Sequence, residues 1–166
     1  MGKKKHSHNA PETIKIGIFT VSSTRTEKDD KSGQWIIKHA KKEGCTVADY
    51  RILADDRWKI TSAVAESIAA NGLHGLILTG GTGISSADVT IEALQPMFSK
   101  EMGAFSSIFA RLSFDKIDSA AILSRTIAGI IGGTAVFCLP GSLDACKLGC
   151  RELIFPELRH IAAHLQ

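Results

Sequence analysis

The chain has 166 residues, of which 44% are hydrophobic and 22% charged, and its formal net charge is +3. This length and composition fit one compact domain with a proper hydrophobic core. Lys3, Lys4 and Lys5 supply three of the positive charges, so the rest of the chain is near neutral and gives no general indication of nucleic-acid binding.

The first twelve residues are polar and basic, and we expect residues 1–12 to form a disordered tail before a single domain over residues 13–166. The tail has no apolar region of the kind that secretory signals carry. No uninterrupted apolar run in the chain reaches the roughly 18 residues that a membrane span needs. The sequence therefore predicts a cytoplasmic protein without a membrane partner.

Regular structure is predicted to start with a strand over residues 14–20, a short β-branched run. A polar, hydroxyl-rich loop over residues 22–33 follows. It lies at the carboxyl end of the strand, where open α/β sheets place ligands. Ser32 is predicted to cap a helix over residues 33–43, which Gly44 ends.

The alternation of residues 45–53 predicts a second strand, and a helix is expected to begin at Asp55 or Asp56. Apolar residues recur every fourth position over residues 60–68, so one face of this helix should pack on the sheet. Gly72 is expected to close the helix.

A third strand over residues 76–79 leads into a glycine-rich loop, Thr79-Gly80-Gly81-Thr82-Gly83, and then into a helical pattern. Glycine permits positive φ and leaves no Cβ between the backbone N–H groups and a ligand, and the following helix contributes its positive end. Such a junction suits an anion, most often a phosphate. The spacing is neither a Walker A loop nor Gly-x-Gly-x-x-Gly, and a tight turn that binds nothing is the alternative.

Helical spacing resumes over residues 89–94, where Pro96 interrupts it, and again over residues 104–112. Residues 127–133 are interpreted as an apolar segment that contains a turn. Residues 134–139 form a continuous apolar run and are predicted to be a buried strand.

The end of the chain is predicted to be helical. Ser142 should cap a helix that runs to about Ile154, and Pro156 should start a final short helix. The alternation of strands and helices along the whole chain indicates a parallel, doubly wound α/β sheet.

The four cysteines are scattered and are expected to be reduced thiols. Cys146 and Cys150, together with His160 and His164, have spacings that a zinc site could use. Buried cysteines and solvated histidines on two helices are the commoner outcome of such spacings.

A set of ordered motifs resembles the family of molybdenum cofactor biosynthesis proteins that contains MogA and MoaB, the molybdopterin adenylyltransferases. The resemblance runs from Ile14 through Ala145 and is greater to MoaB than to MogA. The motifs are Thr20-Val-Ser22, Asp30-Lys-Ser-Gly33, Ala54-Asp55-Asp56, Thr79-Gly-Gly-Thr-Gly83, Asp88-Val-Thr90, Arg111-Leu-Ser-Phe114, Ile122-Leu-Ser-Arg125, Ser124-Arg-Thr-Ile-Ala-Gly129 and Leu139-Pro-Gly-Ser142.

The resemblance implies a three-layer α/β domain, with a mostly parallel sheet flanked by helices, that assembles as a trimer or a hexamer. It also implies transfer of AMP from Mg-ATP to the terminal phosphate of molybdopterin, with release of pyrophosphate. A molybdate-insertion protein is an implied partner, and nucleic acid is not.

In the family the glycine loop holds the phosphate region of the pterin, and two aspartates act together. The matching positions here are Asp55 and Asp88, which the resemblance makes catalytic and magnesium-binding. Mg²⁺ prefers carboxylates and phosphate oxygens, which agrees with that role. On the residues alone, the two aspartates could equally be a helix cap and a favourable first-turn charge. The substrate-binding candidates, whose hydroxyls could also merely close turns, are Ser22, Thr79, Gly80, Gly81, Thr82, Gly83 and Ser142.

Two positions depart from the family pattern, and one of them is Ile91, where Pro is common. Many members carry Arg immediately before the Asp-Val-Thr motif, where this chain has Ala87. A fixed cation beside a transferring phosphate stabilises the transition state. A non-catalytic molybdopterin-binding scaffold of the same fold is therefore a second hypothesis, and an unrelated mononucleotide- or flavin-binding module is a third. Arg125 could pair with a substrate phosphate or with a carboxylate.

Overall fold

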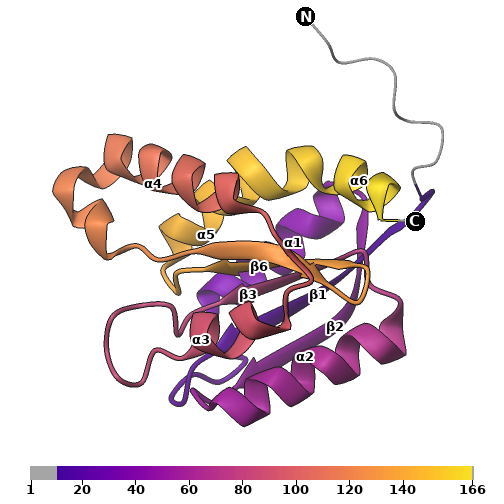
Figure 1. Cartoon of the computed structure of the whole chain (residues 1–166), viewed down its shortest axis with the longest axis horizontal. Coiled ribbons are helices and arrows are strands. Elements are labelled where there is room, and N and C mark those ends of the chain that lie inside the picture. The colour runs from indigo at the N-terminus through magenta and orange to yellow at the C-terminus, as the bar shows by residue number, and fades with distance from the viewer. Residues whose placement is uncertain (1–10, 166) are drawn as a thin grey trace, which may run out of the picture.

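The computed structural model describes residues 11–165 and places them around one six-stranded sheet (Figure 1). Of the predicted disordered tail, residues 1–10 lie outside the described residues. The elements follow in the order β1 (Ile14–Val21), α1 (Lys31–Lys42), β2 (Cys45–Leu53), α2 (Arg57–Asn71), β3 (Gly75–Thr79), α3 (Thr90–Leu94), η1 (Gln95–Met97), β4 (Lys100–Glu101), α4 (Gly103–Ile117), η2 (Asp118–Leu123), β5 (Ile127–Ile131), β6 (Thr134–Leu139), α5 (Leu143–Gly149), η3 (Cys150–Ile154) and α6 (Phe155–His164).

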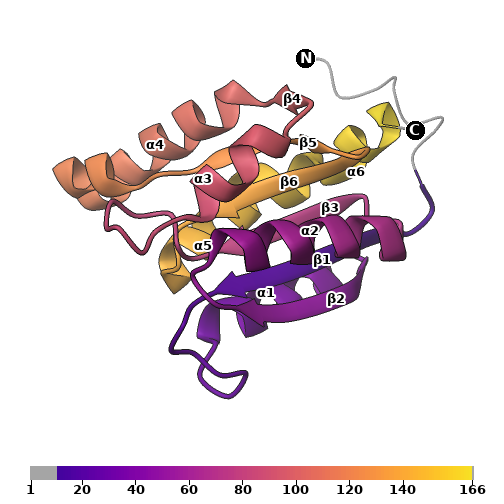
Figure 2. The ribbon, with the colours of Figure 1, turned by 60° about the horizontal axis from the view of Figure 1, so that its bottom comes forward.

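The sheet is mixed but mostly parallel, which confirms the predicted fold class. Its strand order is β2-β1-β3-β6-β5-β4. The first four of these strands run parallel, β5 runs antiparallel to β6, and the short edge strand β4 runs antiparallel to β5 (Figure 2).

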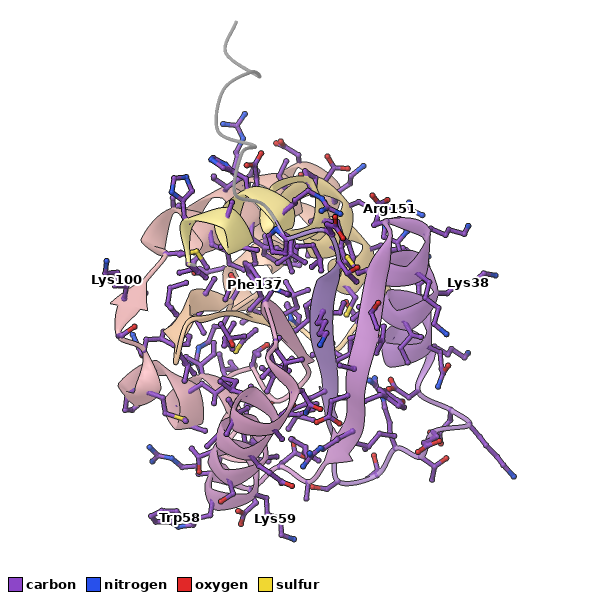
Figure 3. The ribbon with its side chains drawn as sticks, turned by 90° about the vertical axis from the view of Figure 1, so that its right-hand side faces the viewer. Lys38, Trp58, Lys59, Lys100, Phe137 and Arg151 are labelled. Atoms are coloured by element: carbon purple, nitrogen blue, oxygen red, sulfur yellow. The ribbon has the colours of Figure 1, made fainter. Side chains whose placement is uncertain are left out.

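Helices cover both faces of the sheet, which makes three layers. Helices α1, α4, α5 and α6 pack on one face, and α2 and α3 on the other (Figure 1). Side chains alternate between the two cores along each central strand, as the pleat requires. In β6, Phe137 enters the first core and Val136 and Cys138 the second. Figure 3 shows Phe137 enclosed by other side chains, whereas Trp58 on α2 extends outward and is 82% exposed.

The helix after the first loop starts earlier than the sequence suggested. The prediction that Ser32 caps it is wrong, because the carboxylate of Asp30 accepts the N-cap hydrogen bond from Gly33 N at 3.0 Å. Ser32 lies in the first turn and donates its hydroxyl to the Gly141 carbonyl at 3.0 Å. The predictions that Asp56 or its neighbour caps α2 and that Gly72 closes it are confirmed.

Residues 127–133 hold a strand that the sequence interpretation missed. Strand β5 and strand β6 form an antiparallel hairpin through Gly132 and Gly133, which both have positive φ. Gly129 pairs with Val136 inside this hairpin, and a Cβ there would lie 2.4 Å from the Phe98 ring, so the close approach of Phe98 requires glycine. A glycine inside a strand can mark such a close approach rather than a turn.

The carboxyl-terminal helices agree broadly with the prediction. Ser142 caps α5, since its hydroxyl accepts from Ala145 N at 3.2 Å. Helix α5 ends at Gly149, and the chain then passes through one π-helical turn, η3, into α6. Pro156 lies in the first turn of α6. Helix α4 extends to Ile117, five residues beyond the predicted end.

The described residues contain no group of three or more side chains arranged to hold a metal ion. The suggested zinc ligands are separated accordingly, with Cys146 and Cys150 buried in the core and His160 and His164 exposed on α6. All four cysteines are free thiols. None of the helices in the described part of the chain combines the length and the apolar character that a membrane crossing requires.

Asp30 is fully buried and holds the first loop to the sheet. Its carboxylate accepts hydrogen bonds from the Thr20 hydroxyl at 2.6 Å and the Tyr50 hydroxyl at 2.7 Å, in addition to the cap bond from Gly33. Burial and the bond to Asp30 raise the pKa of Tyr50, so its hydroxyl remains a donor at neutral pH. A buried carboxylate with three donors is well satisfied.

We predict that Asp30→Ala lowers the free energy of unfolding by about 3 kcal/mol, because it removes a helix cap and leaves the buried Thr20 hydroxyl and the half-buried Tyr50 hydroxyl without their acceptor. Tyr50→Phe should cost about 1.5 kcal/mol. Urea unfolding measures both. Glu27→Ala, on the exposed part of the same loop, is the control and should change the free energy by less than about 0.5 kcal/mol. Equal effects at positions 27 and 30 would contradict the role of Asp30.

Candidate active site

The carboxyl ends of three neighbouring parallel strands meet at one edge of the sheet. Thr79 of β3 pairs in register with Thr20 of β1 and with Leu139 of β6. The chain leaves β3 through Gly80, whose N–H donates to the Leu139 carbonyl at 3.0 Å. The loops that follow β1, β3 and β6 are therefore brought together, which is where doubly wound folds bind ligands.

Two glycines make the turn out of β3, at φ values of +97° for Gly80 and +62° for Gly81. A Cβ on Gly80 would lie 2.3 Å from the Val21 carbonyl oxygen, and one on Gly81 would lie 2.4 Å from Thr90 Oγ1. No other residue fits there without moving the backbone. The glycine pattern of the sequence thus reflects both a left-handed backbone and a lack of space.

Protein donors hold three carbonyl groups of the loop. The Thr90 hydroxyl donates to Gly80 O at 2.8 Å, and Thr90 N donates to Gly81 O at 2.9 Å. Arg125 Nη1 donates to Gly83 O at 2.8 Å. Carbonyl oxygens repel an anion, so engaging them within the protein favours an anion at this loop.

The loop borders a cavity of about 410 Å³, which we call the glycine cavity. Six of the residues predicted for substrate or metal binding line it, namely Ser22, Asp55, Gly80, Gly81, Thr82 and Gly83. The other lining residues are Val21, Thr24, Arg25, Leu123, Ser124, Pro140 and Gly141. The structure thus brings together residues that lie as far apart in the sequence as Ser22 and Gly141.

Asp55 is fixed at the wall of the glycine cavity. Its Oδ2 accepts from Ser23 N at 2.8 Å and from the Ser23 hydroxyl at 2.7 Å, and Asp55 N donates back to that hydroxyl oxygen at 3.1 Å. Its Oδ1 lies 3.3 Å from the position that a Gly81 Cβ would take. Asp56 instead caps α2 by accepting from Lys59 N at 2.9 Å. The two adjacent carboxylates therefore have different surroundings.

Asp88, Thr79 and Ser142 do not line the glycine cavity. The carboxylate of Asp88 accepts from Ser85 N at 2.9 Å and lies against Gly83, so it closes the segment between residues 83 and 88. Thr79 is buried and donates its hydroxyl to the Pro140 carbonyl at 3.0 Å. Ser142, the cap of α5, lines a neighbouring cavity.

That second cavity, which we call the helix cavity, has a volume of about 480 Å³ and lies between the end of α4 and the α5–η3 segment. It shares Ser124 and Pro140 with the glycine cavity. Its lining residues are Ser113, Lys116, Ile117, Ser124, Pro140, Ser142, Asp144, Ala145, Lys147, Leu148, Arg151 and Glu152. The sequence analysis missed it, although the basic pair Lys147 and Arg151, one helical turn apart, was a usable signal.

The sequence left open whether Arg125 pairs with a substrate phosphate or with a carboxylate, and in the structure it pairs with a carboxylate. Its guanidinium forms an ion pair with Glu92 on α3, besides its bond to Gly83 O. Burial opposes ionisation of Glu92, but the hydrogen bond from Arg125 contributes to a pKa of Glu92 below its ordinary value. The charge of Arg125 is therefore largely neutralised within the protein.

The chain matches a family described as "Probable molybdopterin binding domain" over residues 17–160. It is 41% identical to molybdenum cofactor biosynthesis protein B of Bacillus subtilis over 100% of this chain and 98% of that protein. It is also 41% identical to molybdopterin adenylyltransferase of Pyrococcus furiosus, over 99% and 98% of the two chains. A crystal structure of a molybdenum cofactor biosynthesis protein B superposes with a TM-score of 0.90 at 41% identity, covering 94% of this chain and 98% of that one.

The hydrogen bonds at Asp88 generate a pH prediction. The side chain of Ser85 is the largest cause of the lowered pKa of Asp88, with backbone bonds from Ser85 and Gly83 adding to it. A lowered pKa in the folded state means that the ionised form stabilises the fold at pH values above the ordinary value of 3.8 and that this stability is lost as the pH falls through the lowered pKa.

Asp88→Asn should therefore be less stable than the wild type at pH 6, and the difference should shrink as the pH falls below about 4. Urea unfolding from pH 3 to pH 7 measures this. Asp115→Asn, which alters an exposed carboxylate on α4, should show a smaller dependence. A stability difference at position 88 that is constant over this range would disprove the assignment.

Proposed function

This chain belongs to the MoaB and MogA family of molybdenum cofactor biosynthesis proteins, and we propose that it transfers AMP from Mg-ATP to the terminal phosphate of molybdopterin, releasing pyrophosphate. The observation that carries the proposal is the pair of cavities that meet at Ser124 and Pro140. A reaction that joins two substrates through their phosphates needs two binding regions with a common boundary.

The two cavities differ in a way that suits the two substrates. The glycine cavity is bordered by the anion-binding type of loop, and we assign the reacting phosphates to it. The helix cavity combines Lys116, Lys147 and Arg151 with the carboxylates of Asp144 and Glu152, serine hydroxyls and apolar side chains. We assign to it the pterin, a flat polar ring system that needs both hydrogen-bonding groups and apolar contact.

In the proposed step, a phosphate oxygen of molybdopterin attacks the α-phosphorus of ATP. A P–O bond forms there while the bond between the α-phosphorus and the bridging oxygen breaks, and pyrophosphate leaves with that oxygen. The nucleophile is already ionised at neutral pH, so no side chain has to remove a proton. The protein contributes alignment of the two phosphates and stabilisation of their charge.

The residues present fit a magnesium ion that arrives with ATP. The Asp55 carboxylate lines the glycine cavity, and its Oδ2 is already held by Ser23. Proteins usually hold Mg²⁺ with one carboxylate together with substrate phosphates. A magnesium ion held in this way would neutralise charge between the two anions. We assign to Asp88 the ordering of the glycine loop through Ser85 and Gly83, as the second carboxylate of the site.

The same site also permits a second function. Ala87 is exposed where many family members carry Arg, and Arg125 is paired with Glu92. Without a cation at position 87, and with Arg125 held by Glu92, the site could bind molybdopterin without activating it. The alternative is therefore a non-catalytic molybdopterin-binding scaffold.

Assembly as a trimer or hexamer is part of the proposal, as are a cytoplasmic location and a molybdate-insertion protein as partner. Large apolar side chains are exposed on α4 and η2, a surface that we call the α4 surface. Exposed apolar groups gathered in this way mark interaction sites, and a second copy of the chain is the occupant we propose. Its members and their exposed fractions are Ile108 (48%), Phe114 (54%), Ile117 (49%), Ile122 (86%) and Leu123 (56%).

Purified protein with molybdopterin and Mg-ATP should release pyrophosphate, and Asp55→Asn and Asp88→Asn should each lower turnover by about 100-fold or more while leaving molybdopterin affinity within about threefold. Asp56→Asn is the matched control, because Asn caps a helix as well as Asp does, and its turnover should match the wild type. Normal turnover in Asp88→Asn would remove Asp88 from the site. A wild type that retains molybdopterin but releases no pyrophosphate at any Mg²⁺ concentration would establish the scaffold function instead.

The α4 surface predicts the effect of a charge on assembly. Phe114→Glu and Ile122→Glu should shift the mass measured by light scattering toward the 17.8 kDa of a single chain, because a carboxylate buried between subunits is strongly unfavourable. Trp58→Glu, at an exposed apolar position on α2, should leave the mass unchanged. An assembly insensitive to both α4-surface variants would show that the subunits meet elsewhere.

A further inference from the structure

Arg25 brings a full positive charge to the glycine cavity. It lies in the loop between β1 and α1 and lines the cavity with Ser22 and Gly141. Among the described residues that line this cavity, it is the one cationic side chain, and Asp55 is the one anionic side chain. Nothing in the sequence marks Arg25 as a site residue, because a lone Arg in a polar loop forms no pattern.

The guanidinium of Arg25 forms weak hydrogen bonds with a neutral partner, the Gly141 carbonyl. Its two terminal nitrogens each donate to the Gly141 carbonyl at 3.3 Å, a long distance for an N–H···O bond. The same oxygen accepts from the Ser32 hydroxyl at 3.0 Å. If Arg25 moves away, Ser32 still satisfies the Gly141 carbonyl, so the contact costs little to give up.

Arg125 provides the contrast. It forms an ion pair with the Glu92 carboxylate and donates to Gly83 O, so releasing it would leave a partly buried carboxylate without its cation. Arg125 is therefore committed to holding the loop. Arg25 keeps its charge available for a ligand.

The position of Arg25 is close to the loop and its backbone is fixed. The point where a Gly141 Cβ would stand lies 3.9 Å from Arg25 Nη1 and 3.2 Å from Gly80 Cα. The N–H groups of Thr24 and Arg25 both donate to the Ser22 hydroxyl, at 3.3 Å and 3.2 Å. The backbone thus aims a long cationic side chain at the place where the glycine loop would hold an anion.

We propose that Arg25 binds substrate phosphate in the glycine cavity, exchanging the Gly141 carbonyl for phosphate oxygens when the anion enters. This rests on the proposed function, in which two phosphates must approach each other. A guanidinium can donate two parallel hydrogen bonds to a phosphate, and such charge-assisted bonds are stronger than bonds to a neutral carbonyl. Arg25 supplies from the first loop a cation that position 87 does not supply.

Calorimetric titration with inorganic pyrophosphate in the presence of Mg²⁺ tests this without turnover. Arg25→Gln should weaken binding by about tenfold or more, whereas Arg25→Lys, which keeps the charge, should recover part of that loss. Lys28→Gln removes the same charge from an exposed position on the same loop and should leave the affinity unchanged. Urea unfolding of Arg25→Gln confirms that the variant is folded.

A second titration, with molybdopterin, distinguishes the two sources of phosphate. A loss confined to pyrophosphate assigns Arg25 to the nucleotide phosphates, and a loss confined to molybdopterin assigns it to the acceptor phosphate, and either result supports the proposal. Unchanged affinity of Arg25→Gln for both probes, or a wild type that binds neither, overturns it. Arg25-dependent binding without pyrophosphate release from ATP would leave this assignment standing while the proposed transfer reaction fails.

Discussion

The close approach of the chain to itself at Gly80 is the constraint on which the site depends. Strands β1, β3 and β6 end side by side, and the turn out of β3 passes so near β1 that a Cβ on Gly80 would lie 2.3 Å from the Val21 carbonyl oxygen. Only glycine can make that turn. Because the turn is this tight, the loops after β1 and β6 reach the same cavity and place Ser22 and Gly141 at its wall.

Around that turn, two different sets of side chains have two different roles. One set holds the loop in place, and the other lines the cavity. Thr90 and Arg125 hold the loop through its carbonyl groups, and Asp88 holds it through Ser85. Asp55 and Arg25 line the cavity, one fixed by Ser23 and the other resting on a neutral carbonyl. A fixed scaffold with a few charged groups at its edge is what a phosphoryl-transfer site requires, since such catalysis consists mainly of positioning and charge stabilisation.

Much of the fold could be predicted because its signals are local. The β-branched and apolar runs of β1 and β6, and the glycine that ends α2, all identified their elements. The errors came from tertiary contacts. Asp30, and not Ser32, caps α1, and its position is fixed by Thr20 and Tyr50. Gly129 is a glycine because Phe98 packs against it, and not because the chain turns there. The role of Arg25 could not be predicted, since it depends on which loops meet, and the helix cavity had only the spacing of Lys147 and Arg151 as a signal.

We assign the reacting phosphates to the glycine cavity and the pterin to the helix cavity. A crystal structure with molybdopterin and α,β-methylene-ATP, whose α–β linkage cannot be cleaved, tests this assignment most directly. We expect the molybdopterin phosphate and the nucleotide phosphates at the Thr79–Gly83 loop, with the pterin beside Lys147 and Arg151. Phosphates bound away from that loop, or a pterin bound outside the helix cavity, would contradict it.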